Sequence, residues 1–306
     1  MSGLLLARWV NIYSSSLLLS LFAFRRFYII PVSDRERRLL PDARCMLPLT
    51  WVCWAAMSIS GITWLSAVIS AVTDSGMEWG PAQAVIGGTQ FGHLWLFRSL
   101  LGLIIAGGLL LDTRRKEPRM HSDLPWIALA TINLASLALA GHAGAAGGSP
   151  ANFHFFIDLV HLLASAVWPG SVLPLTVWFV ANAKKSENEL LNSAVLHRFS
   201  AISLGAVAVL ATTGLLNTLF MVRRFSDLYA TTYGQVLAWK IALFWIMIGF
   251  GAENRRLLKV QRQCGAQTGG HQSDLVRLVG NICAESVLAF VVFGLAAALG
   301  TIAPPV

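Results

Sequence analysis

The sequence predicts an all-α fold, a polytopic membrane bundle of about eight transmembrane helices. Hydrophobic residues make up 56% of the 306-residue chain and charged residues only 12%, whereas charged residues are about 25% of soluble domains. Mean hydropathy is +0.64. Apolar runs long enough to cross a bilayer occupy 4–24, 47–72, 92–111, 124–141, 153–180, 199–220, 234–252 and 280–303. We expect a single transmembrane domain over residues 1–306.

The distribution of Lys and Arg predicts which side of the membrane each connection faces. Alternate connections hold 18 of the 23 basic residues, whereas the opposite connections hold only Arg223 and Arg224. By the positive-inside rule the basic connections are cytoplasmic, so both termini face outward. The net charge of +8 then reflects loops beside anionic lipid head groups and does not indicate a nucleic-acid partner.

The first apolar run is expected to be retained as a helix and not cleaved as a signal peptide. Its first basic residue is Arg8, no small-residue cleavage site follows, and Arg25 and Arg26 close the run. This helix also carries Asn11 and Tyr13, so part of its surface should face protein. The four cysteines of the chain include no C-x-x-C pair, which argues against a disulfide framework.

The second to fourth helices carry few polar groups. In helix 47–72, Cys53 and Met57 lie one turn apart, a spacing at which sulfur ligands hold Cu(I), although packing is the simpler interpretation. After an outward connection at 73–91, helix 92–111 begins near His93. It carries Arg98 about one and a half turns deeper, where an arginine is costly unless it is paired or wetted. Helix 124–141 delivers His142 at its outer end.

The fifth helix carries a polar stripe that organises our interpretation of the chain. His154, Asp158 and His161 stand at i, i+4 and i+7, which confines them to an arc of roughly 60° on one helix face. The surrounding stretch from Gly141 to Leu175 contains no Lys, Arg or Glu. His142 precedes this helix across a Gly/Ala turn, close enough to fold back onto the stripe.

The last three helices add small residues and two buried charges. Helix 199–220 contains an A-T-T-G-L-L-N-T run, which permits close helix packing. Lys240 lies about two turns from the outer face and Glu285 about two turns from the inner face, so we do not expect these two to pair. Arg98, Lys240 and Glu285 are candidates for an intramembrane charge network that orients helices, or for groups on a substrate path.

Two candidate metal sites follow from the ligand types. An outer chamber would hold a divalent metal through imidazole and carboxylate groups, at His93, His142, His154, Asp158 and His161. Each of these histidines has a structural alternative, because interfacial histidines often only reach toward water. An inner soft site near Glu285 would use Cys53, Met57 and Cys283.

The order and spacing of several motifs resemble the CopD/PcoD family of bacterial copper resistance membrane proteins. The similarity covers nearly the whole chain. It is carried by G-H-A at 141–143, D-x-x-H-L-L-A-x-A-V-W-x-G at 158–170, R-F-S at 198–200, T-G-L-L-N at 213–217, Y-G-Q-x-L-x-x-K at 233–240, N-R at 254–255, and Glu285.

The resemblance implies a multi-pass protein of the bacterial inner membrane that transports copper between periplasm and cytoplasm. It also implies a role in copper homeostasis and a periplasmic copper-binding partner of the CopC type. The termini, which face outward by the positive-inside rule, would then be periplasmic. The residues that match the family pattern are His142, Asp158, His161, Arg98, Lys240 and Glu285.

Three departures from the family pattern bear on the ligand set. Asn11 stands where a first-helix histidine is expected, His93 occupies a place that is usually not histidine, and W-P-G-S at 168–171 replaces W-x-G-G. His93 or His154 would have to compensate if the first-helix histidine were an essential ligand.

Two other functions remain open from sequence. The first is a b-type haem protein that passes electrons, with one outer haem ligated by His93 and His161. The second is a metal-binding sensor or assembly partner that transports nothing. We expect no enzyme activity, and passage of copper without ATP, because neither a G-x-x-x-x-G-K-[ST] motif nor an aspartyl-phosphate motif is present. The favoured direction is import from periplasm to cytoplasm.

Overall fold

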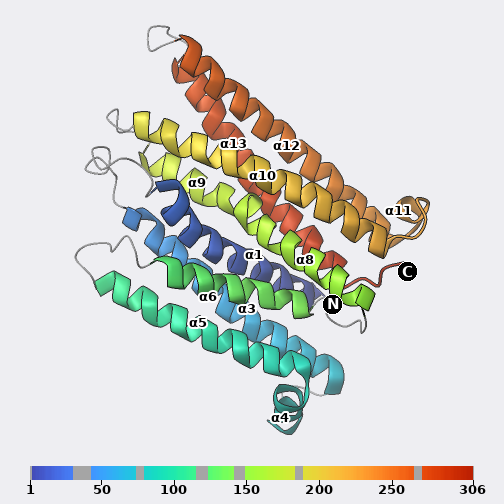
Figure 1. Cartoon of the computed structure of the whole chain (residues 1–306). Coiled ribbons are helices and arrows are strands. Elements are labelled where there is room, and N and C mark those ends of the chain that lie inside the picture. The colour runs from blue at the N-terminus through green and yellow to red at the C-terminus, as the bar shows by residue number, and fades with distance from the viewer. Residues whose placement is uncertain are drawn as a thin grey trace.

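The computed structural model describes residues 2–29, 43–73, 79–114, 123–140, 149–182, 189–264 and 271–305. Helices account for nearly all of these residues, and no strand occurs among them. The all-α prediction is confirmed. Figure 1 shows long helices running side by side in one bundle.

Eight spans within the described residues are long and apolar enough to cross a membrane, as predicted. They are Gly3–Ile29, Leu47–Ala71, Gln90–Arg114, Asp123–Ala140, Asn152–Ala181, Ala194–Met221, Thr232–Lys259 and Val276–Leu299. Several helices extend beyond the apolar runs. For example, α10 (Glu189–Met221) and α12 (Thr232–Cys264) each contain 33 residues.

The fifth span is broken into α8 (Ser149–Val167) and α9 (Pro169–Asn182) at Trp168. Pro169 cannot donate a backbone hydrogen bond, and proline is favoured at the first position of a helix. Close to the break, the carbonyl of Ala166 accepts hydrogen bonds from the hydroxyls of Ser20, at 2.6 Å, and Ser171, at 3.1 Å. The break is therefore stabilised by polar contacts, one of which ties it to α1 (Ser2–Phe24).

Helix α1 lies at the centre of the bundle. It packs against α3 (Leu47–Thr73), α6 (Asp123–Ala135), α9 and α13 (His271–Leu299). Helix α5 (Gln90–Arg114) packs on α3 and α6, whereas α10 packs on α8, and α12 packs on α13. The central position of α1 explains the polar residues in its sequence: Asn11, Ser14, Ser15, Ser16 and Ser20 are all buried.

Both chain ends lie at one end of the bundle, which we call the termini end (Figure 1). Two short helices lie there, α4 (Trp79–Gly88) and α11 (Asp227–Ala230). Helix α4 falls in a connection that the sequence suggested only as a loop. Two of its residues, Ala82 and Val85, are buried against Leu65 and Ile69 of α3. Which side of the membrane the termini end faces stays a prediction.

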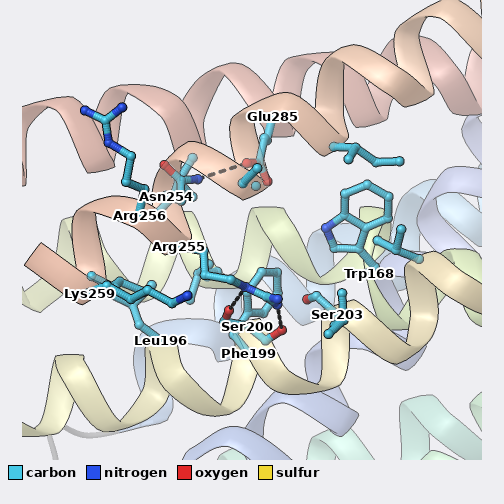
Figure 2. Close-up of a pocket in the computed structure, with 18 residues that line it drawn as sticks. Trp168, Leu196, Phe199, Ser200, Ser203, Asn254, Arg255, Arg256, Lys259 and Glu285 are labelled. Carbon is cyan, nitrogen blue, oxygen red and sulfur yellow. Dashed lines mark hydrogen bonds between the residues drawn. The ribbon is translucent and has the colours of Figure 1, made fainter.

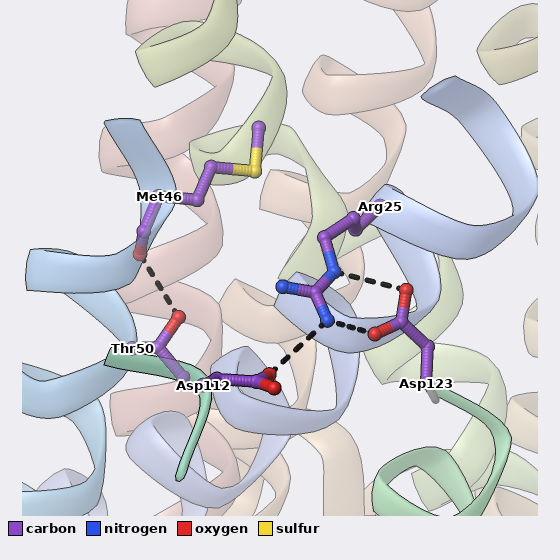
Figure 3. A network of polar contacts seen from close by, with 5 residues as sticks. All are labelled: Arg25, Met46, Thr50, Asp112 and Asp123. Atoms are coloured by element: carbon purple, nitrogen blue, oxygen red, sulfur yellow. Dashed lines mark hydrogen bonds and ion pairs between the residues drawn. The ribbon is translucent and has the colours of Figure 1, made fainter. Parts of the chain in front are cut away.

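The opposite end of the bundle is fastened by an ion-pair cluster (Figure 3). Arg25 lies in η1 (Arg25–Ile29), directly after α1, and its guanidinium donates to both oxygens of Asp123 at the start of α6. It also contacts Asp112, near the end of α5, at 3.4 Å. Asp123 is fully buried. These contacts join three spans where their ends meet.

Candidate functional site

The polar stripe of α8 faces a matching stripe on α10. His161 contacts Thr213, Asp158 contacts Asn217, and the His154 ring stacks on Phe220 with centroids 4.8 Å apart. The α10 partners stand at i, i+4 and i+7, the same spacing as on α8, because the two helices run antiparallel and present one face each. We call these six residues the α8–α10 site.

The hydrogen bonding of His161 indicates which ring nitrogen carries a proton. Its Nδ1 lies 2.9 Å from the Thr213 hydroxyl, which donates its own hydrogen to the carbonyl of Val209 at 2.6 Å. The hydroxyl therefore accepts from His161, so Nδ1 is the protonated nitrogen and Nε2 has a lone pair. Metal-binding histidines are commonly held in this way by a partner on the other nitrogen.

Asp158 acts electrostatically on two half-buried cations and on a tyrosine. Its carboxylate acts electrostatically on Arg8 of α1, on Lys240 of α12 and on Tyr233, also of α12. Arg8 is held by a 2.7 Å hydrogen bond to the carbonyl of Gly300 and lies over the ring of Trp64. Arg8 and Lys240 therefore come from helices outside the α8–α10 pair and set the charge around Asp158.

One polar atom in the site has an unused hydrogen-bonding capacity. The Asn217 amide nitrogen donates to Asp158 at 3.4 Å, while its buried oxygen, Oδ1, accepts no hydrogen bond. A buried amide oxygen without a donor is unfavourable unless water or a cation satisfies it. The site therefore offers one carboxylate, one amide oxygen and one imidazole lone pair close to a single helix interface.

The structure does not bring all predicted outer ligands together. His93 lies at the start of α5 with its Nε2 2.8 Å from the carbonyl of Gly87 in α4, where it is exposed. His142 lies outside the described residues. Among the described residues, no group of three or more His, Cys, Asp or Glu side chains is close enough to hold a metal.

Arg98 belongs to a cluster that is separate from Asp158. Its guanidinium donates to the Asn11 amide oxygen at 2.8 Å, to the Ser15 hydroxyl at 3.2 Å and to the Ser136 hydroxyl at 3.0 Å. It also donates to the carbonyl of Asn133. We call these five residues the Arg98 cluster. Asn11, which departs from the family pattern, is thus an acceptor for this arginine.

The suggested inner soft ligands lie on helices that do not pack together. Cys53 and Met57 are buried on α3, whose main neighbours are α1 and α5. Cys283 lies on α13, whose main neighbours are α12, α9 and α1. Helix α1 contacts both α3 and α13. The sulfur atoms of Cys53 and Met57 therefore lie on one neighbour of α1, and the sulfur atom of Cys283 lies on another.

Glu285 lies on α13, 2% exposed, and borders a cavity of about 340 Å³ (Figure 2). Its Oε1 accepts a 2.9 Å hydrogen bond from the Asn254 amide, whose oxygen accepts from Asn281. The partners of Glu285 therefore differ from those of Lys240, whose charge interacts with that of Asp158. Arg98, Lys240 and Glu285 have three different sets of partners.

Besides Phe220, three contacting residues were not singled out from the sequence: Thr213, Asn217 and Tyr233. Each lies in a motif that carried the family resemblance, T-G-L-L-N or Y-G-Q-x-L-x-x-K. Their roles follow only from the packing of α10 and α12 near α8.

Comparisons with known proteins identify the family to which this chain is related. The family described as "Copper resistance protein D" matches residues 193–299, and "Copper resistance protein D-like, N-terminal domain" matches residues 1–152. Copper resistance protein D of Pseudomonas syringae pv. tomato is 27% identical over 292 residues, which cover 94% of this chain and 93% of that protein.

Two further relatives match parts of the chain. Copper transport protein CutJ of Bacillus subtilis is 28% identical over 66% of this chain and 38% of its own length. Inner membrane protein YebZ of Escherichia coli is 31% identical over 56% of each chain. No solved structure matches. The family models match both halves of the sequence, and the described residues contain eight candidate membrane spans; this chain belongs to the CopD family of copper resistance and transport membrane proteins.

Proposed function

We propose that the chain transports copper ions across the bacterial inner membrane, from periplasm to cytoplasm, and contributes to copper homeostasis. Copper binds first at His154, Asp158 and His161, with His142 as a further ligand. The observation that carries this proposal is the hydrogen bonding of His161, whose Thr213 contact leaves Nε2 able to bind a metal. We omit His93 from the proposed ligands because its ring contacts the carbonyl of Gly87.

The donor set favours a borderline divalent metal such as Cu(II). Imidazole, carboxylate and amide oxygen are suitable ligands for such an ion, whereas thiolate and thioether suit Cu(I). The positive charges of Arg8 and Lys240 interact with the negative charge of Asp158. They also repel a further cation that binds beside this carboxylate. These two cations limit how tightly copper is held, which favours release over storage.

Passage toward the cytoplasm requires a second position, for which we propose Glu285. It is a buried carboxylate whose described partner is the neutral amide of Asn254, so no arginine or lysine bonded to it opposes an arriving cation. Transport proceeds without ATP. A periplasmic protein of the CopC type delivers the copper at the termini end.

The first experiment compares metal content and optical spectra of the purified chain in detergent, before and after addition of Cu(II). The wild type is expected to bind copper with no Soret band. The double variant H142A/H161A is expected to lose this binding while remaining folded, whereas the control H93A keeps it. A Soret band in the wild type would instead identify a haem protein that transfers electrons.

Flux into liposomes then separates transport from sensing. The wild type is expected to move copper down its gradient, and E285Q is expected to slow this movement while leaving copper binding at the α8–α10 site unchanged. Copper binding without flux in the wild type would indicate a sensor or assembly partner. Equal loss of binding and flux in E285Q would mean that Glu285 is structural.

A further inference from the structure

The cavity beside Glu285 extends along two helices in the half of the bundle away from the termini end. Its lining runs from Leu196 to Val207 on α10 and from Ile248 to Lys259 on α12. Each stretch rises about 16 Å at 1.5 Å per residue. A volume of about 340 Å³ exceeds that of a single trapped water several-fold, since a water occupies about 30 Å³ in the liquid.

One side of the cavity faces the region occupied by lipid. Leu204 of α10 lines the cavity and is 56% exposed, and Ala252 of α12 lines it and is exposed as well. Both residues lie within membrane-spanning segments. The space between α10 and α12 is therefore reachable sideways from the bilayer.

The lining changes from basic to apolar along the cavity (Figure 2). Arg256 and Lys259 are exposed at one end, near the end of the α12 span, and Arg256 is 3.8 Å from Glu253. Trp168, Val207 and Ile248 form the other end. A cationic mouth above an apolar slot matches an anionic head group above an acyl chain.

Polar groups line the cavity between its basic end and its apolar end, where the ester groups of a phospholipid would lie. Arg255 donates to the hydroxyl of Ser200 at 2.8 Å and to its carbonyl. One turn deeper on α10, the buried Ser203 hydroxyl has no hydrogen-bond partner. A buried hydroxyl without a partner is unfavourable, and the ester carbonyl of a phospholipid, which lies just below its phosphate, would satisfy it.

The structure assigns this cavity to an anionic phospholipid of the bilayer. Its acyl chain lies between α10 and α12, its ester region contacts Ser203, and its phosphate binds Arg256 and Lys259. The lipid closes the lateral opening and leaves the contact between Glu285 and Asn254 in place. This site is distinct from the α8–α10 site and does not depend on the proposed copper function.

Native mass spectrometry of the full chain in detergent tests this assignment. Phosphatidylglycerol and phosphatidylcholine with identical acyl chains are added separately. The wild type is expected to bind one phosphatidylglycerol about tenfold more tightly than phosphatidylcholine, because each basic residue near the surface contributes to attraction of an anionic lipid. The double variant R256Q/K259Q is expected to lose this preference, and S203F, which fills the cavity, is expected to lose the bound lipid.

The control R223Q/R224Q removes the same charge from exposed positions at the termini end and is expected to keep the preference. Equal affinity of the wild type for the two lipids would overturn the assignment. A preference that survives in R256Q/K259Q, or that is lost equally in R223Q/R224Q, would also overturn it. The charge variant alters exposed positions only, so it decides the question even if S203F fails to fold.

Discussion

The α8–α10 site and the Arg98 cluster both place ionisable groups inside the membrane-spanning region, but they satisfy them differently. Arg98 donates to four oxygen atoms from α1, α6 and the turn that follows α6. At the α8–α10 site, Asp158 has a long contact with Asn217, and the Asn217 oxygen has no donor. Each region thus contains an amide oxygen without a donor, Asn133 Oδ1 in the Arg98 cluster and Asn217 Oδ1 in the α8–α10 site, but only the second lies beside a carboxylate and an imidazole.

This difference indicates how the two regions divide their roles. A cation that donates to four oxygen atoms on neighbouring helices holds these helices together. A carboxylate and an amide oxygen beside an imidazole with a defined lone pair are donor groups that suit a cation. Polar residues within spans thus differ in function according to which hydrogen-bonding and charged groups lie beside them.

The largest effect is expected from Asp158→Asn. The change removes the anion near Arg8 and Lys240, and loss of one partner from a buried charge group costs about 3–5 kcal/mol. We expect loss of copper binding by at least about 100-fold together with reduced stability. Calorimetric titration with Cu(II) and unfolding in detergent measure the two effects. Asp112→Asn, which alters the cluster at the opposite end, is the control and should bind copper normally.

The Arg98 cluster is expected to affect stability alone. Arg98→Leu leaves Asn11, Ser15 and Ser136 without their donor, and we expect the free energy of unfolding to fall by about 3 kcal/mol. Arg98→Lys, which cannot make the same four contacts, should lie between this variant and the wild type. If Arg98→Leu remains fully stable and loses copper binding, the division between the two regions is wrong.

A smaller and more selective effect is expected from Thr213→Val. The substitution keeps the side-chain shape but removes the acceptor that holds the Nδ1 proton of His161. We expect copper affinity to fall about tenfold, with little change in stability, because the tautomer is no longer fixed. Thr218→Val on the same helix, whose hydroxyl bonds only the carbonyl of Gly214 in the described contacts, is the matched control. Identical copper isotherms for Thr213→Val and wild type would argue against His161 as a ligand.

The smallest effect is expected from Gly214→Ala. An added Cβ would lie 3.4 Å from Cε1 of His161, at the short limit of ordinary van der Waals contact, and would restrict the positions open to the ring. We expect a several-fold loss of copper affinity, since ligand geometry is sensitive to small displacements. Gly205→Ala, on the same helix with no atom within 4 Å of its added Cβ, should bind copper as the wild type does. Equal affinities in the two variants would show that the α8–α10 packing does not position His161.

Some features of this protein were accessible from local sequence. The eight spans follow from apolar length alone, because a lipid-facing helix must satisfy its backbone internally and present apolar side chains. The grouping of His154, Asp158 and His161 on one face follows from the helical repeat. The motifs on α8, α10 and α12 were sufficient to place the chain in its family.

Other features depended on which helix packs beside which. Local sequence did not indicate whether the Arg98 guanidinium would bond to Asn11 or to Asp158, because these two candidate partners lie at similar depth on different helices. The break at Trp168 also required the serine of α1 that bonds the carbonyl of Ala166.

The sequence by itself thus determined the class of protein, the number of spans and the spacing of the polar stripe. Tertiary structure alone decided that Thr213 and Asn217 face this stripe, that Arg98 is satisfied elsewhere, and that Glu285 borders a cavity. The physical reason is that periodicity fixes which side chains share a face, whereas hydrogen bonds between helices depend on a packing arrangement that no single helix specifies.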